Sequence, residues 1–451
     1  MKYRIYLLTV TLLIGIISHA QLAPIQKKAL PIGVFDSGTG GLTIMEAMLT
    51  LDVFNNTTGK PGADGKPDFS SEYFQYLADQ ANMPYGNYAA ENKTELLKEH
   101  IFKNMAYFLK KDVAKSEVKM IVLACNTATA YALEDIRKKL KQEGYNVSVL
   151  GVIDAGSKAA LEYQQKNGSG TIGVFATAGT VASNGYPRTL QSMSKLKGMS
   201  ELSIVSQGGS GLAESIDRDW SYFVDTITKA RPDYKGPSVK NSLYRIDTTL
   251  LSAYQFDKTN NKLLCEYDNK GSCLDMQLND PSNYVRYHLV SLLENMLQQK
   301  MEKPMNTLIL GCTHYPYMRD TIAKVLKELY NYKLNNEYRY RSCLAAHVQL
   351  IDPAVETAKE AFVALRTNQL VNNIGKKKNQ FFITIPNTSI QEVKLQPDGW
   401  FTYDYKYGRV AGANKQYVNY VPFDKKNISP SSYNRFQMVL PYTYKEIAKT
   451  F

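Results

Sequence analysis

The 451-residue sequence lacks the compositional features that mark disordered, collagen-like or metal-binding proteins. Charged residues make up only 21% of the chain and hydrophobic residues reach 44%, which excludes disordered and collagen-like chains. The five histidines and five cysteines form no cluster with metal-ligand spacing, so we expect neither a metal nor another cofactor. At about 150 residues per domain, the length predicts a folded protein of two or three domains.

Long apolar runs are also missing, apart from one at the N-terminus. Lys2 and Arg4 precede the apolar run Leu7–Ile17, which is followed by Ser18-His19-Ala20. A basic start, a short apolar segment and a small-residue cleavage site predict a signal peptide over residues 1–20. We therefore expect an exported protein that works in the periplasm, with no membrane span once the signal is removed.

Tight basic clusters are scarce as well, although the formal net charge is +12. The lysines are scattered, and the run Lys376–Lys378 is too short to indicate more than a solvated face. We therefore expect no nucleic-acid partner. The positive balance agrees better with an acidic small molecule as partner.

Five cysteines are an odd number for an exported chain, so at least one thiol stays unpaired. Cys265 and Cys273 flank a polar, glycine-containing segment typical of a hairpin turn. A turn there would bring their Cα atoms within bridging range, which predicts a disulfide. Cys125, Cys312 and Cys343 would remain free, with Cys343 the inert one.

The chain alternates short apolar runs with longer amphipathic segments as far as about residue 370, which predicts an α/β fold of doubly wound type. The expected strands are Pro31–Asp36, Tyr73–Asp79, Lys119–Cys125, Ser148–Asp154, Thr171–Thr177, Leu202–Gln207, Thr307–Cys312 and Val348–Asp352. The expected helices include Glu95–Leu109, Thr127–Lys141, Ala155–Gln165, Asn283–Met301, Tyr317–Leu329 and Val355–Leu370.

Two pairs of these strands repeat. Residues 31–36 are similar to residues 171–176, and residues 121–125 are similar to residues 308–312, which is a weak internal repeat. The second copy is longer because of a polar insert at about 217–281. From residue 389 to 451 the chain is rich in aromatic residues, and alternation over 400–408 predicts a strand. We expect this extension to cover a sheet edge or a pocket; a carbohydrate-facing platform is the alternative.

Both repeats end on a cysteine followed by hydrogen-bonding side chains. Cys125 precedes Asn126-Thr127, and Cys312 precedes Thr313-His314. Ligands of open α/β sheets gather at the carboxyl ends of strands, so both thiols would face a crevice. Two opposed thiols suit 1,1-proton transfer at a carbon acid, in which one thiolate removes a proton and the other thiol returns one. A thiol with a reference pKa of about 8.5 needs little perturbation for this work.

Five motifs occur in the order seen in glutamate racemases, and the chain resembles that family over about residues 30–385. They are Asp36–Leu42, Pro84–Gly86, Ala124–Ala128, Thr177–Val181 and Gly311–Pro316. The resemblance implies a cofactor-independent amino-acid racemase with two pseudo-symmetric α/β domains and its site in the cleft between them. We expect the first domain at 28–150 plus 322–388 and the second at 151–321.

The resemblance also implies roles for individual residues. Cys125 would take the proton from the D-enantiomer and Cys312 from the L-enantiomer. Asp36 would assist Cys125, while His314 and Glu214 would assist Cys312. Substrate binding would fall to Asp36, Ser37, Pro84, Tyr85, Gly86, Asn126, Thr127, Thr180, Thr313 and His314.

Several alternatives stay open. Asp36 could be a helix N-cap and His314 a structural residue. Glu214 lacks the Cys-Pro that usually precedes it in the family. The substrate could be aspartate or another small acid instead of glutamate, or the chain could be an exported two-lobed binding protein without turnover. A homodimer is left open.

Overall fold

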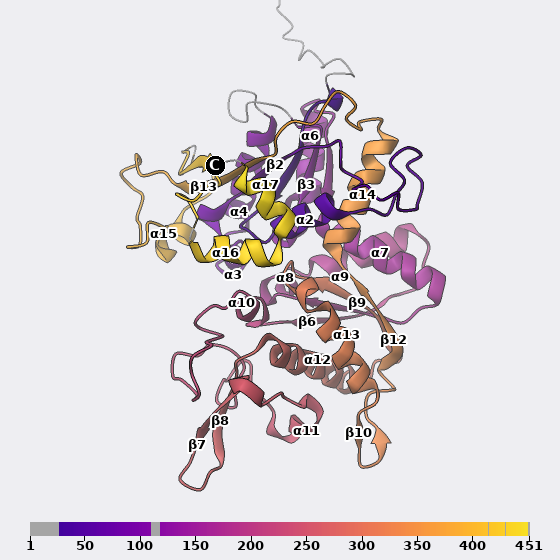
Figure 1. Ribbon diagram of the computed structural model, residues 1–451, viewed down its shortest axis with the longest axis vertical. Helices are drawn as coiled ribbons and strands as arrows, with labels where there is room; N and C mark the ends of the chain where they lie inside the picture. The colour runs from indigo at the N-terminus through magenta and orange to yellow at the C-terminus, as the bar shows by residue number, and fades with distance from the viewer. Residues whose placement is uncertain (1–26, 110–117, 414, 429, 450–451) are drawn as a thin grey trace, which may run out of the picture.

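The computed structural model describes residues 27–109, 118–413, 415–428 and 430–449. The predicted signal peptide lies outside the described residues. Two open sheets form two lobes, drawn one above the other in Figure 1. This is the predicted α/β class with two doubly wound domains.

The first sheet holds six strands in the order β14-β13-β2-β1-β3-β4. Their bounds are β1 (Ile32–Asp36), β2 (Phe74–Ala78), β3 (Met120–Leu123), β4 (Ser148–Gly151), β13 (Gln380–Pro386) and β14 (Val418–Pro422). All neighbours run parallel except β14, which is antiparallel to β13. The central strands are buried along their whole length, as parallel strands covered on both faces must be.

The second sheet holds four parallel strands in the order β6-β5-β9-β12. Their bounds are β5 (Thr171–Ala176), β6 (Ser203–Gly208), β9 (Met305–Gly311) and β12 (Leu344–Ile351). This order matches β2-β1-β3-β4 strand for strand, so the two repeats occupy equivalent places. The predicted pseudo-symmetry is confirmed.

Helices cover both faces of each sheet. In chain order they are α2 (Leu42–Thr50), α3 (Gly86–Ala90), α4 (Thr94–Leu109), α6 (Asn126–Gln142), α7 (Val152–Asn167), α8 (Ala178–Ala182), α9 (Gly185–Leu196), α10 (Leu212–Ile216), α11 (Leu251–Tyr254), α12 (Pro281–Gln298), α13 (Arg319–Tyr330), α14 (Pro353–Thr367), α15 (Tyr403–Gly408), α16 (Pro430–Val439) and α17 (Pro441–Ala448). All eight expected strands and all six expected helices are present, with ends shifted by a few residues. No helix in the described ranges is long and apolar enough to cross a bilayer.

The expected domain boundaries need one correction. Residues 322–388 were assigned to the first domain, yet β12 joins the second sheet beside β9 and α13 packs on β12 and α12. The second lobe therefore continues through Ile351. The chain returns to the first lobe with α14, which packs on α2.

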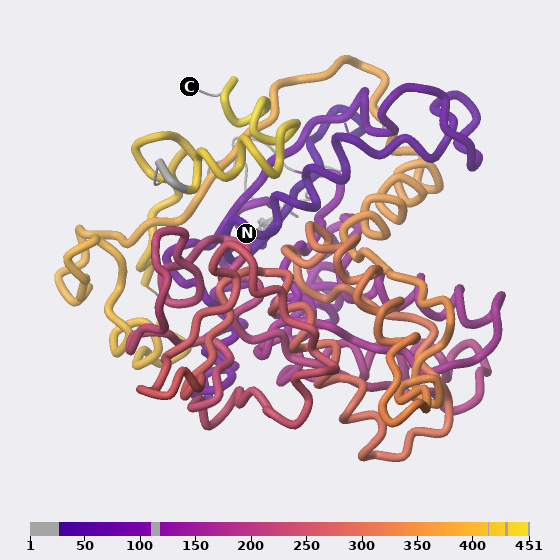
Figure 2. Tube along the Cα trace, turned by 60° about the horizontal axis from the view of Figure 1, so that its bottom comes forward, coloured from indigo at the N-terminus to yellow at the C-terminus, as the bar shows by residue number. Residues whose placement is uncertain are grey.

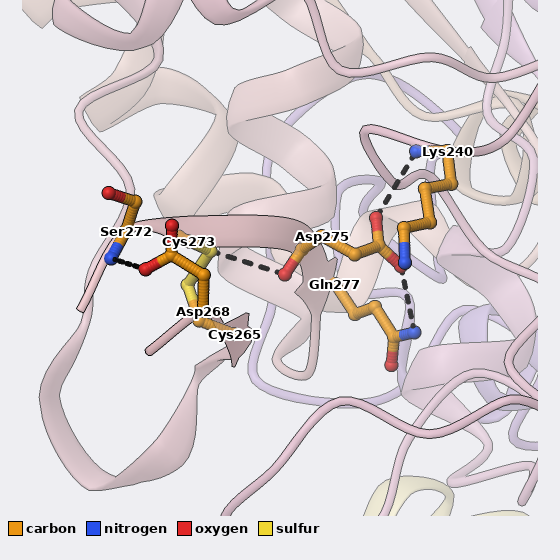
Figure 3. Close-up of a disulfide and its surroundings, with 7 residues drawn as sticks. All are labelled: Lys240, Cys265, Asp268, Ser272, Cys273, Asp275 and Gln277. Carbon is orange, nitrogen blue, oxygen red and sulfur yellow. Dashed lines mark hydrogen bonds between the residues drawn. A yellow bond between two sulfur atoms is a disulfide. The ribbon is translucent and has the colours of Figure 1, made fainter. Parts of the chain in front are cut away.

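The insert forms the predicted hairpin from β7 (Leu263–Tyr267) and β8 (Cys273–Leu278). Cys265 and Cys273 are joined by a disulfide with their Cα atoms 5.5 Å apart, which confirms the predicted bond (Figure 3). Beside it, the Asp275 carboxylate accepts hydrogen bonds from the Lys240 backbone N–H at 3.1 Å and the Gln277 side chain at 3.2 Å. Together these bonds hold a segment that has little core of its own.

The C-terminal extension covers the free edge of the first sheet, as predicted, because β14 pairs there. The strand predicted at 400–408 is wrong: α15 occupies 403–408, with the Thr402 hydroxyl capping its first turn. Tyr403 and Tyr407, four residues apart, pack ring to ring at 4.6 Å on one helix face, so the aromatic spacing serves a helix. Both α16 and α17 follow, and α17 packs on α2, where Figure 2 shows yellow beside indigo.

Candidate active site

Cys125 lies between the end of β3 and the start of α6. Its Sγ accepts a hydrogen bond from the Ala128 backbone N–H at 3.4 Å, so the thiol caps the helix. The thiol also donates to the Ser37 hydroxyl at 3.5 Å. Cys125 is only 6% exposed. The sulfur therefore sits inside the protein at the N-terminus of a long helix, where negative charge is stabilised.

Asp36 ends β1 beside Cys125. Its Oδ2 accepts hydrogen bonds from the backbone N–H groups of Gly41, at 2.8 Å, and Gly38, at 3.3 Å. The carboxylate thus anchors the turn before α2, but the N-cap of that helix is Gly41 and no side chain caps it, so the N-cap alternative for Asp36 is wrong. Asp36 also contacts the Cys125 thiol. A side chain at Gly41 would collide with Asp36 and Ala124, which explains the glycine.

The electrostatics of Cys125 differ from the expectation of a thiol that is easily ionised. Burial, and then the charge of Asp36, raise the pKa of Cys125 to about 12. Burial also raises the pKa of Asp36 itself, against the hydrogen bonds that it accepts. Burial and the charge of Asp36 therefore favour the protonated thiol of Cys125.

Cys312 follows β9 at the equivalent place of the second sheet and is also 6% exposed. Its Sγ lies 3.8 Å from His314 Nδ1, and the same nitrogen lies 3.4 Å from the Thr313 hydroxyl. On the far side of the ring, His314 Nε2 forms an ion pair with Asp217 Oδ1 at 3.1 Å. Burial works against the charged ring, but pairing with Asp217 and with the Cys312 sulfur raises the pKa of His314 to about 10.

Asp217 is the residue that sequence reasoning missed. The resemblance assigned this place to Glu214, which lies in the first turn of α10, near His314 but without a contact as close as that of Asp217. Burial would raise the pKa of Asp217, yet pairing with His314 and Arg435 lowers it. The spacing Glu214–Asp217 was the available signal, since residues three apart share a helix face.

The segment that contains Pro84, Tyr85 and Gly86 lies beside α8. A side chain at Gly86 would lie 3.6 Å from the Gly179 Cα, so the two backbones nearly touch. Tyr85 is buried and its hydroxyl donates to Asp79 at 2.6 Å. Pro84 itself is exposed and points away from the core.

Thr180, Asn126, Thr127 and Thr313 lie close to the contact between the lobes. Thr180 is buried and receives a hydrogen bond from the Thr177 hydroxyl at 2.9 Å. Asn126 accepts a hydrogen bond at 3.1 Å from Tyr186 of α9, while Thr127 is buried in the first turn of α6. The hydroxyl of Thr313 reaches the first lobe as well, because a side chain at Gly40 would lie 2.7 Å from it.

Residues next to both thiols thus contact the opposite lobe: Asn126 contacts Tyr186, and Thr313 contacts Gly40. Cys125, Cys312 and Cys343 are free, as predicted, and all three are buried. Cys343 hydrogen-bonds the Tyr340 carbonyl at 3.4 Å, away from the other two. Within the part of the chain that the structure describes, no group of three His, Cys, Asp or Glu side chains could hold a metal ion.

The chain is similar to known proteins along most of its length, although no family model matches it. It is 26% identical to the glutamate racemase of Levilactobacillus brevis, covering 78% of this chain and 86% of that protein. It is 27% identical to the glutamate racemase of Oceanobacillus iheyensis, covering 81% and 93%. A crystal structure of a Bacillus anthracis glutamate racemase isoform superposes with a TM-score of 0.46 at 23% identity, covering 79% and 89%.

Both sequence relatives are matched over more than four fifths of their own length, so the similarity includes both lobes. The chain is a homologue of the glutamate racemases.

Proposed function

We propose that the protein interconverts the enantiomers of a small acidic amino acid, with glutamate as the first candidate. One of Cys125 and Cys312 would remove the α-proton, and the other would donate a proton to the opposite face. The observation that carries this proposal is the pair of unpaired, buried thiols at equivalent strand ends of two matching sheets. A binding protein has no need of two such thiols. The names of the sequence relatives support glutamate as the substrate.

The proton balance of the reaction is simple. One thiolate removes the α-proton, the bonding electron pair stays on the α-carbon, and the opposite thiol donates its proton to the other face. The two enantiomers differ in which thiol starts as the base. The raised pKa of Cys125 makes it the proton donor at rest. Cys312 lies beside the ring of His314. The resemblance to glutamate racemases assigns the proton of the L-enantiomer to Cys312.

The polar groups around the thiols support an acidic amino acid as substrate. The N-terminal turn of α6, with Asn126 and Thr127, presents backbone N–H groups and the positive end of a helix dipole. Ser37, Thr180 and Thr313 add hydroxyls from both lobes. Such donors would hold a carboxylate and stabilise the charge that develops at the α-carbon.

We also propose that the protein acts outside the cytoplasm, in the periplasm. The N-terminal sequence supports export, and so does the Cys265–Cys273 disulfide, because such bonds persist in oxidising compartments. The free thiols Cys125 and Cys312 are buried, which would slow their oxidation.

The test is exchange of the α-proton with deuterated solvent for glutamate, aspartate and a panel of other amino acids. We expect both enantiomers of glutamate to exchange and interconvert. Exchange confined to aspartate or another acid would make that acid the substrate instead of glutamate. No exchange with any amino acid would favour a binding protein without turnover. Cys343→Ala is the matched control, because this thiol is equally buried but lies away from the site.

A further inference from the structure

Arg435 belongs to α16 of the C-terminal extension, yet its side chain reaches the candidate site. One guanidinium nitrogen forms an ion pair with Asp217 Oδ1, and the other donates to the Thr39 hydroxyl at 3.3 Å. Thr39 lies in the loop after β1, and Asp217 follows α10. One side chain therefore joins the first lobe, the second lobe and the extension.

The helix that carries Arg435 is firmly seated. Phe436 and Leu440 are buried in the core that the lobes share. Beyond them, the carboxylate of Glu46 on α2 accepts hydrogen bonds from the backbone N–H groups of Tyr442, at 3.1 Å, and Thr443, at 2.7 Å. These bonds fix the start of α17. The preceding helix α16, which carries Arg435, is therefore held in place at its C-terminal end.

Asp217 has no comparable support from its own segment. It follows a helix of five residues, and the next residue, Arg218, has a φ of 57°, which ends the helical path. The residues from there to Asp247 form no helix or strand. A carboxylate at such a place needs a partner from elsewhere to keep one orientation.

We propose that Arg435 is a positioning residue for the Cys312 half of the site, holding the Asp217 carboxylate against His314 Nε2 so that His314 Nδ1 stays on the Cys312 sulfur. This inference rests on the proposed racemase function only for its effect on turnover. The charged and titratable groups around His314 are Cys312, Glu214, Asp217, Arg435 and Tyr317.

A purely electrostatic role for Arg435 makes the opposite prediction. Removing a nearby positive charge would by itself raise the pKa of His314. Freeing the Asp217 carboxylate to turn toward water would instead lower that pKa, because the ring loses its anionic partner. The sign of the change therefore separates positioning from simple charge.

The experiment is a histidine NMR titration of the full mature chain, with the signal assigned by His314→Gln. We expect Arg435→Gln to lower the pKa of His314 by about 1, and Asp217→Asn to lower it by about 1 to 3. An unchanged or raised pKa in Arg435→Gln would overturn the proposal. Lys449→Gln removes a charge from the same extension and should leave the titration unchanged, since Lys449 pairs with Glu446 on the surface.

Turnover gives the second readout. We expect Arg435→Gln to reduce kcat by about 10- to 100-fold with little change in KM, as misplacing a catalytic group does. Arg435→Lys keeps the charge but not the fork that reaches two partners, so its kcat should be intermediate. Equal kcat in Arg435→Lys and wild type, with no change of the His314 pKa, would count against positioning even if Arg435→Gln failed to fold.

The two proposals fail in different ways. If the wild-type protein exchanges no amino-acid proton, the proposed function falls, and the His314 titration still decides whether Arg435 positions Asp217. If wild type racemises glutamate and the His314 pKa does not fall in Arg435→Gln, the function stands and the positioning role falls.

Discussion

The two halves of the site share a backbone plan but differ in charge. Cys125 stands beside Asp36, an acid, at the start of a long helix. Cys312 stands beside His314, a base whose charged form is held by Asp217. An internal repeat thus gave each lobe one thiol at the same strand end, but the two thiols have neighbours of opposite charge.

The C-terminal extension deepens this difference. In the first lobe it adds β14 at the sheet edge, and Arg409 supports the loop before Pro84 by donating to Asn82 at 2.8 Å. In the second lobe it supplies Arg435 to Asp217. The matching strand orders therefore indicate where the two thiols lie, whereas the added C-terminal segment changes which residues surround each half of the site.

The largest effect should come from removing either thiol. Cys125→Ala and Cys312→Ala should each lower racemisation by about 10²- to 10⁴-fold, because a positioned acid or base is lost. Free enantiomers have equal energy, so kcat/KM must remain equal in both directions in every variant and cannot tell the halves apart.

Solvent exchange of each enantiomer can separate the two thiols. We expect Cys312→Ser to exchange the α-proton of D-glutamate alone and Cys125→Ser that of L-glutamate alone. Near-normal racemisation by either alanine variant would contradict the two-thiol mechanism, while Cys343→Ala should behave as wild type.

The second effect distinguishes the two carboxylates near His314. Asp217→Asn should lower kcat by about 10- to 100-fold, because His314 loses the partner that holds its ring. Glu214→Gln should have a smaller effect, since the ion pair with His314 belongs to Asp217. Steady-state kinetics of both variants check this, and a larger loss in Glu214→Gln would return the role to the residue that the family resemblance indicated.

The fold was predictable because the signals for it are local. Each buried parallel strand is a short apolar run, which the sequence shows directly. The cysteines that follow β3 and β9 could be placed from the internal repeat alone. The hairpin disulfide was also local, since Cys265 and Cys273 flank one turn.

The missed features depend on contacts between distant residues. Asp217 lies in a polar stretch where nothing in the sequence shows that Arg435 will pack against it. The raised pKa of Cys125 follows from burial, which a reference value for an exposed thiol cannot supply. The boundary at Ile351 was missed because β12 could extend either sheet, and only the pairing with β9 decides.

The third effect is on stability and concerns the insert, which only the second lobe carries. The double variant Cys265→Ser, Cys273→Ser should lower the free energy of unfolding by about 2.5 kcal/mol, the chain-entropy value for so short a loop. Denaturant unfolding measures this under oxidising conditions. The pKa of His314 should stay near its wild-type value, because the hairpin does not contact the ring; a large change would show that the insert also shapes the Cys312 half.

The fourth effect is a pH dependence of stability in which His314 and the buried His288 act in opposite directions. The folded-state pKa of His314 is raised from 6.5 to about 10, so its protonation contributes stability that is fully present below pH 6.5 and is lost as the pH rises through 10. Burial lowers the pKa of His288 to about 4, so the stability linked to its neutral ring is present above pH 6.5 and is lost as the pH falls from 6.5 through 4. The free energy of unfolding of wild type relative to His314→Gln should therefore shrink between pH 7 and about 10. A constant difference across that range would mean that His314 is neutral in the folded protein, and the contrast between the two halves of the site would then disappear.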